Sequence, residues 1–154
     1  MIEERLFSIF TRLKEHCIAE FVLQGTLGSR AYALKPNMAP IRFGVDNRLI
    51  PLPLLGLHKT GFMSLETAVS HGQIVAVFVG SEGYIDSIDA EFDIDFANIE
   101  KPDFLWLEIV SRQYRHYEAY LIKRTEGEPE LEVIPNDKIN PGESFYTEIF
   151  KLHS

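Results

Sequence analysis

The sequence predicts an α+β fold in which an N-terminal helix and a short middle helix pack on a mostly antiparallel sheet. Three patterns indicate this class: helical spacing at the N-terminus, a β-branched run mid-chain, and alternating segments separated by turn residues in the second half. The chain has 154 residues, of which 45% are apolar and 25% charged, as is typical of a globular domain. We therefore expect a single domain over residues 1–154.

The N-terminal third is predicted to contain one helix and two strands. Residues 2–17 place apolar side chains at intervals of three and four, which predicts an amphipathic helix. Residues 19–35 then favour β-structure and are interrupted by Gly25 and Gly28, so we expect two strands joined by a glycine turn. Residues 48–62 are apolar but contain prolines, which indicates a partly buried connection.

The remainder is predicted to be a short helix followed by an antiparallel meander. Ser64 and Gly72 are suitable caps for a helix of about two turns. Residues 74–80 form a β-branched run typical of a central strand. For residues 104–124 we favour strands, with a helix as the alternative. Residues 143–152 fit either a last strand or a short closing helix.

Several features of the sequence bear on the compartment. No apolar run reaches the ~20 residues that a membrane-spanning helix needs, and the first residues carry acids where a secretory signal needs positive charge. Cys17 is the single cysteine, so no internal disulfide can form, and its position on the helical apolar stripe predicts a buried structural residue. The histidines show no zinc-binding spacing. We expect a cytoplasmic protein without a cofactor or a bound metal.

Charge is distributed unevenly along the chain. Lys, Arg, Asp and Glu give a balance of +2 in residues 1–77 and of −10 in residues 78–154. Nucleic-acid binding depends largely on Lys and Arg, so the acidic half argues against direct binding of nucleic acid. The same asymmetry favours a basic protein as partner.

The acid-rich residues 88–100, called here the acidic segment, alternate between apolar and acidic side chains. This alternation predicts a strand with one apolar face and one carboxylate face. The predicted partner-binding residues are its acids: Asp89, Glu91, Asp93, Asp95 and Glu100. Unpaired carboxylates on this strand would attract and select a basic surface.

Two other interpretations of the acidic segment stay open. Neighbouring strands could neutralise it through the cations Arg112, Arg115, Lys123 and Arg124. Its acids also match the ligand spacing of a calcium-binding loop, although Ile94 stands where such a loop needs glycine.

An enzymatic alternative depends on a short resemblance. Gly28–Ser29 and Asp93–Asp95 resemble the Gly-Ser turn and paired aspartates of nucleotidyltransferases, but here the two pieces are far apart in the sequence. The resemblance implies metal-dependent phosphoryl or nucleotidyl transfer that uses the carboxylates of Asp89–Asp95. Residues 25–30 lack the spacing and the lysine of a phosphate-binding loop, so a hairpin turn is the favoured interpretation there.

The favoured hypothesis is a non-enzymatic acidic protein that docks and inhibits a basic protein, such as a toxin or a nucleic-acid enzyme, in the manner of an immunity protein or antitoxin. The alternatives are the metal-dependent transferase and a structural subunit of a homo-oligomer.

Overall fold

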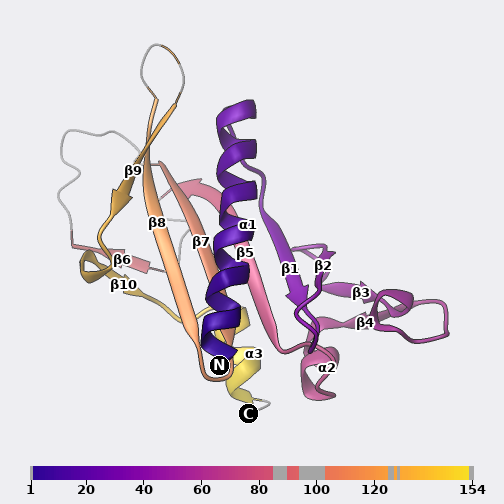
Figure 1. The fold of residues 1–154 in the computed structure, drawn as a ribbon. Helices are drawn as coiled ribbons and strands as arrows, with labels where there is room; N and C mark the ends of the chain where they lie inside the picture. The colour runs from indigo at the N-terminus through magenta and orange to yellow at the C-terminus, as the bar shows by residue number, and fades with distance from the viewer. Residues whose placement is uncertain (1, 85–89, 94–102, 125–126, 128, 153–154) are drawn as a thin grey trace.

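The computed structural model describes residues 2–84, 90–93, 103–124, 127 and 129–152. It confirms the predicted α+β class, with helices packed on a six-stranded antiparallel sheet and two small sheets beside it (Figure 1). In chain order the helices and strands are α1 (Ile2–Gln24), β1 (Arg30–Leu34), β2 (Pro40–Phe43), β3 (Leu49–Pro51), β4 (Phe62–Ser64), α2 (Leu65–Ser70), β5 (Ala76–Tyr84), β6 (Ala90–Phe92), β7 (Asp103–Ser111), β8 (Arg115–Lys123), β9 (Glu130–Ile134), β10 (Ile139–Pro141) and α3 (Phe145–Leu152).

The main sheet has the strand order β2-β1-β5-β7-β8-β9, and each neighbouring pair is antiparallel. The predicted central strand is β5, which lies between β1 and β7. Residues 104–124 form β7 and β8 rather than the alternative helix. Strand β7 is buried along nearly its whole length because other elements cover both of its faces.

Helix α1 lies lengthwise across one face of the main sheet (Figure 1). Its predicted apolar stripe is buried against Phe78, Leu107 and other residues that alternate along the central strands. Cys17 is 1% exposed, which confirms its predicted burial. None of the described helices has the length and apolar character needed to cross a membrane.

The prediction of two strands in residues 19–35 is wrong. Helix α1 continues to Gln24, because Phe21 extends its buried stripe by one more turn. Gly25 then adopts a φ of 75°, the left-handed conformation common after a helix end, and donates its N–H to the Phe21 carbonyl over 2.7 Å. Residues 25–30 consequently connect a helix to β1 instead of forming a hairpin turn.

The opposite face of the sheet is covered in two separate places. At one end α2, α3 and neighbouring loops bury Ala33, Val77 and Val110. At the other end β6 and β10 pair with each other and lie over Phe104 and Trp106. The predicted cap Ser64 accepts a hydrogen bond from the Thr67 N–H at the start of α2, and the last segment is the helix α3.

The acidic segment does not belong to the meander where we expected it. Strand β5 pairs directly with β7 as far as Tyr84 opposite Asp103, so no strand lies between them. The described part of the acidic segment, β6, pairs with β10 instead. The sequence pattern predicts a strand with two unlike faces, but it does not determine which strand becomes its partner.

Candidate functional site

The acidic segment is described at Glu91 and Asp93, and both side chains are exposed. Glu91 lies opposite the neutral Asn140 of β10. Asp93 follows β6 and donates its backbone N–H to the Lys138 carbonyl over 2.7 Å. The structure thus places two of the predicted partner-binding acids at the surface of the β6–β10 sheet. The other three, Asp89, Asp95 and Glu100, lie outside the described residues.

The apolar side of β6 is anchored in the protein. Ala90 and Phe92 pack against a buried cluster that includes Trp106. The rings of Phe92 and Phe104 stack with their centroids 4.7 Å apart and an interplanar angle of 3°. The alternation predicted for the acidic segment is therefore confirmed over residues 90–93. This anchoring holds the Glu91 backbone in a defined place on the surface.

Three cations that could have neutralised the acidic segment are engaged with other acids. Arg115 pairs with Glu108, Lys123 pairs with Glu132 at 2.8 Å, and Arg124 pairs with Glu82 at 2.9 Å and with Asp103 at 3.3 Å. The fourth, Arg112, is exposed in the turn between β7 and β8. Within the described ranges, no ion pair joins a cation to Glu91 or Asp93.

The metal-binding hypotheses concern acids that the structure describes only in part. In the part of the chain that the structure describes, no three His, Cys, Asp or Glu side chains are grouped so that they could hold a metal ion. Because Asp89 and Asp95 lie outside this part, the metal-dependent transferase remains a prediction, as does the homo-oligomer.

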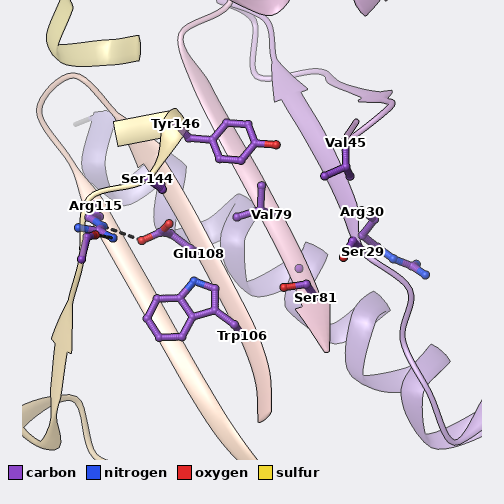
Figure 2. A pocket seen from close by; sticks show the side chains of 12 residues that line it. Ser29, Arg30, Val45, Val79, Ser81, Trp106, Glu108, Arg115, Ser144 and Tyr146 are labelled. Atoms are coloured by element: carbon purple, nitrogen blue, oxygen red, sulfur yellow. Dashed lines mark hydrogen bonds and ion pairs between the residues drawn. The ribbon is translucent and has the colours of Figure 1, made fainter. Parts of the chain in front are cut away.

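A pocket lies on the sheet face opposite α1, between the two places where that face is covered. It has a volume of about 210 Å³ and is lined mainly by residues of β5, β7 and the segment from β10 into α3. Figure 2 shows Val79 and Ser81 on β5 beside Trp106 and Glu108 on β7, with Tyr146 of α3 reaching over them.

The pocket contains a buried carboxylate, that of Glu108, whose residue is only 2% exposed. The Nε–H of Arg115 donates to its Oε2 over 2.6 Å (Figure 2). Nη2 of Arg115 donates to the Gly142 carbonyl over 2.8 Å. Arg115 therefore links β8, β7 and the residue that follows β10. This contact fixes one wall of the pocket.

Burial raises the pKa of the Glu108 carboxyl above its ordinary value, although the nearby Arg115 guanidinium opposes this shift. The indole nitrogen of Trp106 lies on the side of its ring that faces Glu108 (Figure 2) and also favours the ionised carboxylate. A buried acid with a perturbed pKa in a pocket is a recognised sign of a functional site.

A second polar cluster lies between α1 and β8, on the other face of the sheet. Glu118 accepts hydrogen bonds from Lys14 at 3.0 Å and from Tyr120 at 2.7 Å, and it also contacts His116 at 2.9 Å. Burial alone would raise the pKa of Glu118, but these hydrogen bonds lower it overall. Because these side chains satisfy one another, we interpret the cluster as a structural contact that holds α1 on the sheet.

Glu108 and the pocket were not predicted from the sequence. The available signal was a single acid inside the apolar run of residues 104–110, because a charged side chain is rarely buried without a partner. Arg115 was considered only as a cation that could neutralise the acidic segment. Its pairing with Glu108 depends on the β7–β8 register, in which Glu108 lies opposite Tyr117, two residues from Arg115.

Comparison with known proteins does not assign the chain to a family: no protein-family model matches it, and no curated protein or solved structure is significantly similar to it.

Proposed function

We propose that this protein binds the basic surface of a protein partner through the acidic segment and inhibits that partner, as an immunity protein or antitoxin in the cytoplasm would. The observation that carries the proposal is the environment of Glu91. Its carboxylate is exposed on β6, its cross-strand neighbour is the neutral Asn140, and the cations of β8 pair with other acids.

The exposed acids affect both the rate at which a partner associates and which partner is selected. Unpaired carboxylates on an anchored strand attract a basic surface, accelerate association and disfavour acidic competitors. Asp137 adds another exposed acid next to β10, and Lys138 is the adjacent cation. The net charge of −8 for the whole chain acts in the same direction.

A pull-down from the source cell tests the proposal by comparing the wild type with the variant Glu91→Gln/Asp93→Asn. We expect the wild type to retain a basic protein in about 50 mM salt and to lose it near 0.5 M, where the screening length falls to a few ångströms. The double variant should retain much less of this protein at low salt.

The matched control is Glu15→Gln/Glu148→Gln, which removes the same charge from exposed positions on α1 and α3. This control should retain the partner as the wild type does. Equal loss from both variants would show that net charge alone matters. Equal recovery by wild type and Glu91→Gln/Asp93→Asn would remove the acidic segment from the account. The activity of the captured protein, measured with and without this chain, tests inhibition.

A further inference from the structure

We propose that the pocket beside Glu108 binds a small uncharged heterocycle whose edge carries an N–H donor next to a carbonyl acceptor, the chemistry of carbonyl-bearing nucleobases and cyclic amides. The evidence for this site is independent of the acidic segment.

The size of the pocket limits the ligand. The pocket has a volume of about 210 Å³. Pockets for drug-sized ligands are larger, roughly 300 to 1,000 Å³. One ring or two fused rings would fill the space, whereas a nucleotide or a peptide would extend beyond it.

The polar groups of the pocket select a ligand edge that both donates and accepts. Glu108 offers carboxylate lone pairs beyond those that Arg115 and the Trp106 indole N–H use. Arg115 uses Nε toward Glu108 and Nη2 toward Gly142, and among the described contacts its Nη1 group makes none. Glu108 and Arg115, which both line the pocket, therefore supply an acceptor and a donor.

The charge balance of the pocket favours a neutral ligand. Among the charged residues that line the pocket, Glu108 and Arg115 cancel each other, and the guanidinium of Arg30 forms hydrogen bonds with Glu20 of α1. A ligand with a net charge would lose its hydration without meeting an uncompensated opposite charge, which is costly in a buried site. An uncharged ligand avoids this cost.

Aromatic and apolar side chains supply the remaining surface. Trp106 and Tyr146 contribute rings, and Val45 and Val79 contribute apolar contact for a flat ligand. The Tyr146 hydroxyl is buried and points across β5 toward Val45 (Figure 2). Burial raises the pKa of this hydroxyl, and the nearby Arg48 guanidinium opposes the shift. Tyr146 therefore contributes its ring to the pocket, while Arg48 lies beside its hydroxyl.

The test is an NMR titration of the ¹⁵N-labelled full chain with uracil, cytosine and 2-pyrrolidinone. Trp106 is the sole tryptophan, so the spectrum contains one indole N–H signal, which reports directly on the pocket. We expect a saturable shift of that signal for at least one of these probes, with a Kd below about 1 mM. Benzamidine and benzoate, which are charged rings of similar size, should bind at least about tenfold more weakly.

The variant Ser81→Leu should fill the pocket from β5 and weaken binding by at least about tenfold. Ser70→Leu makes the same chemical change on the exposed end of α2 and should leave binding unchanged. If Ser81→Leu does not fold, the backbone amides of the wild type give the answer: shifts centred on Ser81, Glu108 and Gly142 support the site. Shifts elsewhere, no saturable shift from any neutral probe, binding by Ser81→Leu at wild-type affinity, or stronger binding of a charged ring would overturn it.

Discussion

The contact between Arg115 and Glu108 can be tested by replacing Arg115 with methionine. The substitution keeps much of the length of the side chain but leaves the Glu108 carboxylate without its cation. Glu108 is 2% exposed, while the Arg115 side chain is 25% exposed. Removing one partner from a buried pair costs 3–5 kcal/mol, and the partial exposure of Arg115 places this pair at the lower end, about 3 kcal/mol. The variant should therefore unfold at markedly lower denaturant.

Urea unfolding followed by circular dichroism measures this loss. With a slope of about 2 kcal/mol per molar urea, a loss of 3 kcal/mol lowers the midpoint by about 1.5 M. The additional change Glu108→Gln removes the unpaired charge, so the double variant Glu108→Gln/Arg115→Met should recover at least about 1 kcal/mol at pH 8.

The pH dependence separates loss of the charge contact from loss of packing. Without Arg115, the folded-state pKa of Glu108 should rise further above the ordinary value of 4.5, so the folded protein binds more protons than the unfolded chain above that pH. The free energy of unfolding of the variant should then fall, relative to wild type, as pH rises from 5 to 8. A deficit equal at both pH values, or one below about 1 kcal/mol at pH 8, would refute the assignment of Glu108 as a buried, ionised partner.

Three further predictions concern the face of the sheet that α1 covers. Glu118→Gln should lower the free energy of unfolding by about 1 kcal/mol at pH 7 and should flatten its decline in acid. The lowered pKa of Glu118 gives stability that is present above the ordinary value of 4.5 and is lost as pH falls through the folded-state pKa. Urea unfolding from pH 7 to 3 measures both effects, and a decline in acid equal to that of the wild type would contradict them. Gly80→Ala should lower the free energy of unfolding by about 1 kcal/mol, since the added Cβ would lie 3.1 Å from a Leu107 methyl group and 3.2 Å from the Cys17 sulfur. Urea unfolding measures this loss. A free energy of unfolding equal to that of the wild type would show that the packing around Gly80 adjusts without cost. Burial raises the pKa of the Cys17 thiol to about 11, so its thiolate fraction at pH 8 falls on the order of 100-fold. A thiol reagent should therefore label Cys17 only in denaturant. Rapid labelling of the native protein would contradict the burial of Cys17.

The fold class could be predicted because local pattern and tertiary packing agree in most segments. The spacing of apolar residues in 2–17 reports the face of α1 that packs on the sheet. Ser64 is the N-cap of α2 as predicted, whereas the C-cap is His71, and Gly72 follows it with a φ of 72°. The boundary after Cys17 was mispredicted because β-favouring residues such as Phe21 and Val22 also serve on a helix that is held by tertiary contacts.

The candidate sites show where such patterns stop being informative. Alternation identified the exposed side of Glu91, but the pairing of β6 with β10 depends on contacts distant in sequence. Glu108 lies in an apolar run whose alternate residues face opposite sides of the sheet. Its surroundings therefore depend on the strand order and on how far α3 extends over the sheet face that lies opposite α1. Neither quantity is contained in local sequence.

The Glu108–Arg115 pair is difficult to explain by stability alone. A buried ion pair gains little over an apolar pair of similar volume, because the loss of hydration offsets most of the attraction. The flanking parts of the same sheet face are apolar, with Val77 and Val110 under the helices and Phe104 under β6, so aliphatic side chains would have fitted a continuous core. The polar pair instead lies where the cover is open, beside the single tryptophan and with hydrogen-bonding capacity to spare. That placement is what a binding function requires, and it is the reason for testing the pocket with ligands as well as the acidic segment with proteins.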